Sequence, residues 1–435
     1  MKKRARWAYA AAAMLLGIAG AAPALAQAPD RAVEFEDLGL DRWLDTSARA
    51  LGMSAFAATA SDATALAVNP AGLARAKRIS AVGALGAAHT TFDYTYHRTT
   101  RSDDLDEYAL AFAGTTVPLP VLRGSLVPAF GIQRAFSASL ALGYQGFNEP
   151  DQREDRLELQ QTGAVYAVHF GAGIDIASAL ALGLSFFVLD GGVELVRQYD
   201  MRGRVVDPDV HTFVYESVDS DVDGYGARVG VSLYAASWLQ LAFVATSSVV
   251  VELESSIFVE TTRQVDNDVG SFSRASTTRT TEYKLPYRLD GALAIPIARS
   301  FLFAFQAGYS DWAEAAIDDQ RLITTGLVTV MRPVVDLRAG VEWTSNQPPL
   351  RVRAGVESTR AVTIFQEADR IDYDQLERVQ SEIPQLRLSL GAGYLLARRV
   401  NLEMSLGYEH SDRASVTVTD VRERFNVLLG GGYWF

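Results

Sequence analysis

The sequence of 435 residues contains no cysteine. This absence excludes a disulfide-stabilised scaffold, a cysteine zinc site and lipid attachment at an N-terminal cysteine. Basic charge is also scarce, because the formal net charge is -12 and the pI is about 5.0. A protein that binds nucleic acid needs a basic face, so no nucleic-acid partner is expected.

Long apolar runs are missing except at the N-terminus. There, four basic residues precede an apolar run over residues 7–21, and small residues follow at 24–26. This pattern predicts a signal peptide over residues 1–26, cleaved before Gln27. Beyond it no run of ~18 apolar residues exists, so no helix of the mature chain should span a bilayer. The basic residues are Lys2, Lys3, Arg4 and Arg6.

Most of the mature chain shows apolar and polar residues in strict alternation. Residues 386–394 place leucines on one face and Arg387 and Ser389 on the other, and residues 401–409 repeat the pattern. Successive side chains of a strand point to opposite faces, so each segment has one apolar and one polar face. A soluble sandwich shows the same period, so this alternation alone predicts only β-structure.

Three further features favour an outer-membrane barrel. Aromatic residues stand near segment boundaries, as an interfacial girdle requires. Short turns alternate with long polar connections, and the chain ends on Phe435 like many barrel proteins. The short turns are at residues 235–237, 298–300, 346–349 and 397–399, and the long connections at 199–223, 263–281 and 364–384. We therefore predict an all-β transmembrane antiparallel barrel of about 14 strands over residues 79–435.

Residues 27–78 do not alternate and form a separate segment. Asp62 can cap a short helix from Ala63 to Val68, and Asn69 with Pro70 should end it, because proline disfavours helical dihedrals at the preceding residue. The simplest interpretation is a surface turn before the first strand.

The same segment resembles the N-terminal motif of the FadL-type outer-membrane transporters of hydrophobic compounds. The resemblance is carried by residues 47–53 and 61–74, and weaker matches follow in the family's order at 308–312, 337–343, 350–355 and 388–394. Two departures are Ser54-Ala55 in place of two glycines and Ser61 in place of an aspartate.

The resemblance implies that residues 27–78 form a hatch inside the barrel. The hatch motif comprises Asp62, Asn69, Pro70, Ala71 and Gly72, and the obstructing role is carried over to Asn69, Pro70 and Ala71. A branch that resembles the PorV-type accessories of protein secretion carries nearly the same motif. The motif therefore implies the fold more firmly than the cargo.

If the apolar faces of the predicted strands point outward to lipid, charged residues of both signs lie on the inner face of the wall. Such rows can form cross-strand ion pairs that brace the wall and anchor a polar hatch. The alternative is that one arginine holds a ligand carboxylate. The candidates for luminal ligand or hatch contacts are Arg338, Arg351, Arg353, Arg387 and Glu403, with Asp336, Glu342 and Glu357 nearby.

Catalysis and metal binding have little support in the sequence. The five histidines are scattered, and only His169 falls on an inward face, so we expect no enzyme, no catalytic residue and no cofactor. Residues 219–224 open like a calcium loop, but Gly230 stands where a glutamate should close it, so we expect an acidic outer loop and no metal site.

The expected function is passive uptake of hydrophobic small molecules, such as long-chain fatty acids, across the outer membrane by a monomer. Its expected partners are the hydrophobic ligand, outer-membrane lipid and the outer-membrane assembly machinery. The ligand could leave sideways through a bulge in the wall, and glycines such as Gly191 and Gly192 are candidates among which the sequence does not choose. The alternatives are a PorV-like accessory of secretion or surface attachment, and an open polar porin.

Overall fold

The computed structural model describes most of the chain beyond residue 43. The described residues are 44–96, 99–120, 125–148, 153–204, 209–265, 268–297, 300–312, 316–318, 329–330, 333–345, 347–360, 365–366, 384–396, 399–414 and 418–435. The predicted signal peptide lies outside the described residues. Within them, no helix is both long enough and apolar enough to cross a bilayer.

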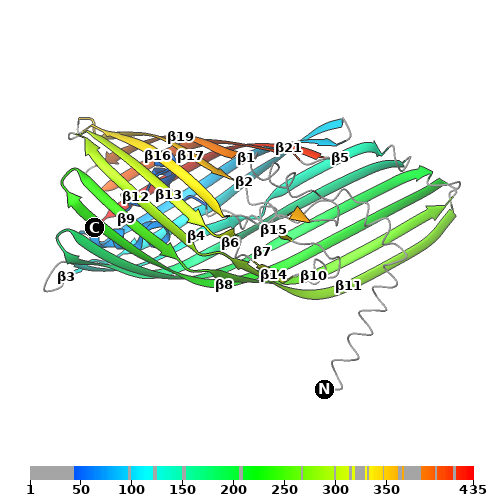
Figure 1. Cartoon of the computed structure of the whole chain (residues 1–435), viewed down its shortest axis with the longest axis horizontal. Helices are drawn as coiled ribbons and strands as arrows, with labels where there is room; N and C mark the ends of the chain where they lie inside the picture. The colour runs from blue at the N-terminus through cyan, green and yellow to red at the C-terminus, as the bar shows by residue number, and fades with distance from the viewer. Residues whose placement is uncertain are drawn as a thin grey trace, which may run out of the picture.

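The described residues form a closed antiparallel barrel of 14 strands, as predicted (Figure 1). It closes because β1 pairs with β2 on one side and with β21 on the other. The wall strands are β1 (Ser80–Tyr96), β2 (Thr99–Thr116), β4 (Ser125–Ser137) with β5 (Leu140–Asn148), β6 (Arg153–Ala177), β7 (Leu180–Arg204), β8 (Asp209–Ala236), β9 (Leu239–Thr246) with β10 (Val249–Val265), β11 (Asp268–Leu285) with β12 (Arg288–Ile297), β13 (Phe301–Ser310) with β14 (Ala316–Asp318), β16 (Val334–Thr344), β17 (Leu350–Arg360), β19 (Pro384–Leu396), β20 (Val400–Ala414) and β21 (Val418–Trp434).

Three short strands complete the β-structure. β3 (Leu119–Pro120) pairs with β4, and β15 (Thr329–Val330) pairs with β18 (Phe365–Gln366) in a separate small sheet. The four predicted short turns all fall between consecutive wall strands at the end where β1 begins and β21 ends. We call this end the turn end, and we call the opposite end the mouth.

The alternation of the sequence becomes the two faces of the wall. Leu388 and Leu390 are 51% and 63% exposed on the outside, while Arg387 and Ser389 between them are buried inside. The other C-terminal strands follow the same rule, so a belt of apolar side chains surrounds the barrel. Such a belt suits the hydrocarbon of a bilayer.

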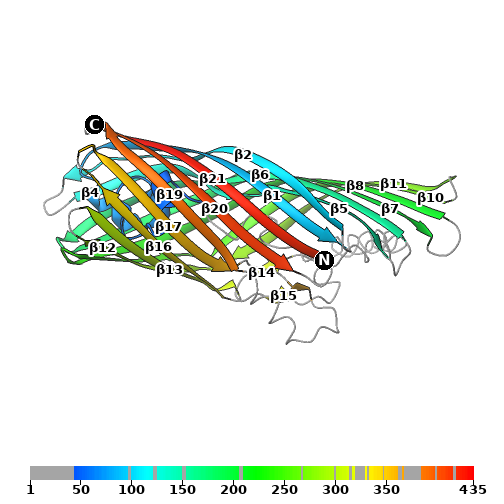
Figure 2. The same ribbon diagram turned by 90° about the horizontal axis from the view of Figure 1, so that it is seen from above.

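The wall is much taller on one side. Strands β6, β7, β8, β10 and β11 project well beyond β1, β20 and β21 at the mouth (Figure 2). In this projection the polarity of the two faces is reversed. Tyr199, Met201 and Val214 are buried on the inside, while Asp219, Asp221 and Asp223 are exposed on the outside.

The projection corrects two predictions. Residues 199–223 and 263–281 were expected to be long polar connections, but β7, β8, β10 and β11 continue through most of both ranges. Main-chain hydrogen bonds also pair strands in water, so a hairpin whose register is already set can continue without an apolar outer face. Most of the third expected connection, 364–384, lies outside the described residues.

Leu390 provides a test of which surface faces lipid. Leu390→Arg should lower the free energy of unfolding by about 2–4 kcal/mol, because a cation near the middle of the apolar belt loses its hydration. Thr278→Arg, on the exposed outer face of β11 in the projection, is the matched control and should change it by less than about 0.5 kcal/mol. Unfolding in lipid vesicles, followed by tryptophan fluorescence, measures both. Equal effects of the two substitutions would contradict this assignment.

Candidate transport path inside the barrel

Residues 44–79, here called the luminal segment, lie inside the barrel near its turn end (dark blue in Figure 1). They form α3 (Ala48–Met53), α4 (Ala65–Val68) and the 3-10 helix η1 (Pro70–Arg75). Ser47 caps α3 by accepting a hydrogen bond from the Ala50 amide at 3.1 Å. Leu51, Met53 and Leu73 have 1% exposure or less, so the segment is packed as tightly as a protein core.

Asn69 joins the luminal segment to the wall. Its Nδ2 donates to the carbonyl oxygen of Ala57 at 2.9 Å and to Ser232 Oγ of β8 at 3.0 Å. Its Oδ1 accepts from the Ala71 amide at 3.2 Å, which starts η1 directly after α4 ends. The Asn69 side chain and its partners are buried from solvent, so the loss of any of these hydrogen bonds would leave a buried polar group unpaired.

The other motif residues shape the same turn. Asp62 Oδ1 accepts from the Thr64 amide at 3.0 Å, and burial raises the pKa of the Asp62 carboxyl. The helix begins at Ala65, two residues later than expected. Pro70 is the first residue of η1. A Cβ at Gly72 would lie 2.2 Å from the Ala60 carbonyl oxygen, so only glycine fits.

Glycines in the wall allow the luminal segment to lie directly on the strands. A Cβ at Gly183 of β7 would lie 2.1 Å from the Pro70 carbonyl carbon, and one at Gly230 of β8 would lie 2.2 Å from Asn69 Oδ1. A Cβ at Gly340 of β16 would lie 2.0 Å from the Met53 carbonyl oxygen. The wall therefore carries no side chain at these three places, where the backbone of the segment lies directly on it.

A network of ion pairs crosses the inner face of β16, β17, β19 and β20. Arg353, which is fully buried, donates from Nε to Glu342 at 2.7 Å and from Nη2 to Glu403 at 2.8 Å. Arg338 pairs with Asp336 at 3.1 Å and with Glu357 at 3.2 Å, and Arg387 also binds Glu357. The structure thus brings together four of the five predicted luminal residues. Arg351 has no ion pair with any other residue that the structure describes.

The luminal segment joins this network through its own charges. Arg49 Nε lies 3.2 Å from Glu342 Oε2, and Asp45 binds Arg387. Burial lowers the pKa of the Arg49 guanidinium, but Glu342 and Glu403 outweigh it, so the pKa is raised and the charge persists.

Uncharged contacts add to this anchoring, and sequence reasoning missed them. Gln306 Oε1 accepts from the Phe56 and Ala57 amides at 3.3 and 3.2 Å, and Arg228 donates to the Leu66 carbonyl oxygen at 3.3 Å. Their polar positions in otherwise apolar strands were the only available signal.

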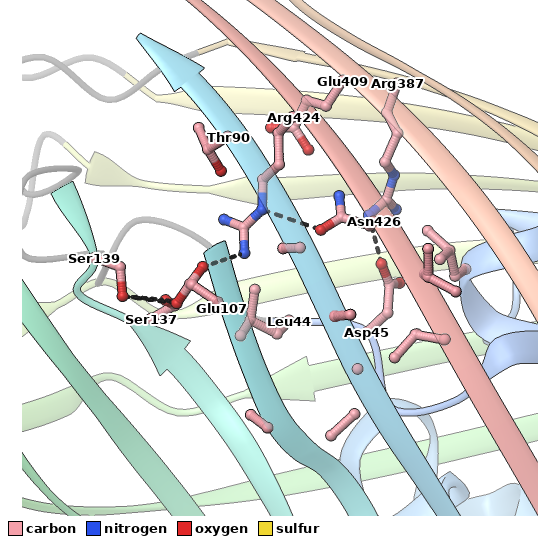
Figure 3. A pocket seen from close by; sticks show the side chains of 18 of the residues that line it. Leu44, Asp45, Thr90, Glu107, Ser137, Ser139, Arg387, Glu409, Arg424 and Asn426 are labelled. Atoms are coloured by element: carbon pink, nitrogen blue, oxygen red, sulfur yellow. Dashed lines mark hydrogen bonds and ion pairs between the residues drawn. The ribbon is translucent and has the colours of Figure 1, made fainter. Parts of the chain in front are cut away.

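The wall is interrupted where β4 meets β5. Strand β2 pairs with β4 only from Phe112 to Thr116, and within the described residues β5 has register partners only in β6. The carboxylate of Glu107 spans this interruption (Figure 3). It accepts hydrogen bonds from Arg134 at 2.8 Å, Ser139 at 2.6 Å and Arg424 at 2.9 Å, so β2, β4, β21 and the connection that leads into β5 meet at one side chain.

Two cavities lie on the mouth side of the luminal segment. The first, here called the wall cavity, has a volume of about 170 Å³ and lies against the interruption, between Leu51 of the luminal segment and Glu107. The second, here called the central cavity, has a volume of about 140 Å³ and lies between Phe56 of the luminal segment and Trp312. Charged and apolar side chains from several strands line both cavities.

Two further expectations need correction. Residues 219–224 are part of β8 rather than a loop, and their aspartates form a straight exposed row that cannot surround an ion. Gly191 and Gly192 pair in register with Val165 and Ala164, so no bulge forms there. The irregularity in this part of the wall lies at Arg134 instead.

His169 is fully buried on the inner face of the wall. Its Nε2 lies 3.2 Å from Gln133 Oε1, and its ring centroid lies 5.6 Å from that of Phe187. This is the environment of a hydrogen-bonded wall residue.

Gly183→Leu tests whether the luminal segment blocks the lumen. The new side chain overlaps the Pro70–Ala71 backbone, so the segment should be displaced and the ion conductance should rise severalfold. Gly291→Leu is the matched control, because a Cβ there meets no atom within 4 Å, and its conductance should equal that of the unchanged protein. Conductance in planar bilayers measures both. A Gly183→Leu barrel as tight as the control would mean that the segment is not a plug.

Comparison with known proteins shows which fold this is. No protein-family model matches the chain, and no curated protein matches its sequence. Solved structures do match it. A FadL homologue from Pseudomonas aeruginosa has a TM-score of 0.63 at 12% identity, with 91% of this chain and 100% of that chain covered.

Two toluene transporters are similar to nearly the same extent. TodX from Pseudomonas putida has a TM-score of 0.61, and TbuX from Ralstonia pickettii has a TM-score of 0.58. Each is 12% identical, with 91% of this chain and 99% of that chain covered. At such low identity the likeness concerns the fold. The chain has the fold of the FadL-type outer-membrane channels, as the motif around Asn69 predicted.

Proposed function

We propose that this protein is a passive outer-membrane channel for hydrophobic small molecules. The observation that carries the proposal is an apolar inner surface that leads from the mouth to the wall cavity. Near the mouth it consists of Leu157, Leu159, Tyr199, Met201 and Val214, which cluster with Phe92 and Leu140. Closer to the luminal segment a second, buried apolar cluster lies on the inner face of the wall, made of Phe136, Phe187, Leu189, Val251 and Trp312, and Trp312 lines the central cavity.

This inner surface is unusual for a channel that conducts polar solutes. A polar pore lines its lumen with polar side chains and leaves it open to water. Here an apolar molecule that leaves water would gain roughly 0.8 kcal/mol for each methylene it buries. The surface therefore favours entry of molecules that have an apolar body and disfavours entry of inorganic ions.

The luminal segment closes the direct route to the turn end, so we propose that the ligand leaves through the side of the barrel. The interruption between β2 and β5 is the place where the wall lacks continuous backbone pairing. Tyr108, beside Glu107, is 80% exposed on the outer surface at this level. A ligand that passes Glu107 would reach lipid without displacing the luminal segment.

The cargo and the cell biology belong to the same proposal. Two neighbours are named as toluene transporters, so monoaromatic hydrocarbons are candidates beside the long-chain fatty acids implied by the resemblance. Export by a signal peptide over residues 1–26, insertion by the assembly machinery and a monomeric state complete the proposal. A secretion accessory needs no apolar route through its lumen, so the route favours transport.

Binding of saturated fatty acids to the purified protein tests the cargo. Affinity should rise by about fourfold for each added methylene, which corresponds to roughly 0.8 kcal/mol, until the apolar surface is covered. Calorimetry of a series from six to sixteen carbons gives the slope. Affinity that does not depend on chain length would contradict an apolar binding surface and favour the accessory role.

Glu107 tests the sideways exit. Glu107→Gln weakens the contacts to Arg134 and Arg424 from charge-assisted to neutral, so β5 should open more readily and uptake should accelerate severalfold. Glu260→Gln weakens an exposed ion pair, to Arg274, in the projection and should leave uptake unchanged. Uptake of an apolar fluorophore into vesicles measures the rate. Identical rates for both variants would place the exit elsewhere.

A further inference from the structure

The wall cavity has the size of a site for one ring. Its volume is about 170 Å³, and a buried apolar cavity of about 150 Å³ is known to hold benzene. It lies between the luminal segment and strands β1, β2, β20 and β21, directly inside the interruption of the wall. A ligand on the proposed exit route would pass through it.

One side of this cavity is apolar. Leu51 of the luminal segment packs with Ala84 of β1, Ala111 of β2 and Leu428 of β21 in one buried cluster. Except for Ala84, these side chains line the cavity, together with Phe92. A flat apolar body would cover this side without displacing polar groups.

The other side of the cavity holds hydrogen-bond donors that lack an acceptor. Arg387 Nε and Ser411 Oγ are buried and have no hydrogen-bond partner within the described part of the chain, and the same is true of Arg134 Nε. A buried donor without an acceptor is costly, so such groups usually mark a water or a ligand oxygen. Arg387 and Ser411 stand on neighbouring strands, β19 and β20.

The charged residues that line the wall cavity include more arginines than carboxylates. Four arginines and three carboxylates line the wall cavity, so arginines outnumber carboxylates in its lining by one. The central cavity has the opposite balance, with three arginines and four carboxylates. A monovalent anion would therefore prefer the wall cavity. The lining charges of the wall cavity are Arg134, Arg387, Arg422 and Arg424 with Asp45, Glu107 and Glu409.

We infer that the wall cavity is a binding site for an aromatic monocarboxylate. The carboxylate accepts hydrogen bonds from Ser411 and Arg387, and the ring lies on Leu51, Ala111 and Leu428. This assignment rests on the proposed function and makes it more specific, because it distinguishes the ligand from a neutral hydrocarbon and from a long alkyl chain. Toluene would fill the same space but would leave the donors unpaired.

Benzoate and toluene are the matched probes, since they differ by a carboxylate in place of a methyl group. The purified full-length protein should bind benzoate at least tenfold more tightly than toluene in calorimetric titrations. Ser411→Ala removes one donor and should weaken benzoate binding about tenfold without changing toluene binding. Ser220→Ala, a buried inward serine on β8 that pairs with Ser255, is the control and should change neither.

Ala111→Leu locates the site independently of hydrogen bonding. The added side chain fills the apolar side of the cavity, so benzoate binding should fall at least tenfold while heat-modifiable gel migration shows an intact barrel. Benzoate binding no tighter than that of toluene, or unaffected by Ser411→Ala and Ala111→Leu, would overturn the assignment. If toluene still binds in that case, the proposed function stands; if neither probe binds, the assignment fails and the fatty-acid series decides the proposed function.

Discussion

The structure depends most on the direct contact between the backbone of the luminal segment and glycines of the wall. The segment packs backbone against backbone at Gly183 and Gly340, and the amide of Asn69 fixes it there. Dispersion forces fall steeply with separation, so such contact holds only if no Cβ intervenes. The barrel and the segment therefore specify one another, and neither surface is complete alone.

Charge fixes the orientation of the segment rather than its affinity for the wall. Buried ion pairs such as Arg353 with Glu342 lose hydration that their attraction barely restores, so they contribute little net stability. Breaking one partner would nevertheless leave a charge uncompensated in the lumen. Arg49 and Asp45 of the segment enter this network at two points, which admits a single register of segment against wall.

The fold was predictable because a lipid-facing wall forces a period of two on the sequence. That period predicted the strands around Leu390, the short turns and the strand number. The family motif singled out Asn69 as a residue of the luminal segment. The projection was not predictable, because pairing in water does not require apolar alternation there. The interruption beside Glu107 was also hidden, since it arises from pairing between β2 and β4 that stops early, and no local pattern encodes where pairing stops.

The central claim is that this barrel is closed to inorganic ions and open to molecules that have an apolar body. Its most direct test measures both properties in one preparation of vesicles that contain the unmodified protein. Ion flux should stay near that of protein-free vesicles while an apolar solute with a slow spontaneous rate enters severalfold faster than without the protein. High ion flux, or hydrophobic entry no faster than in protein-free vesicles, would contradict the account.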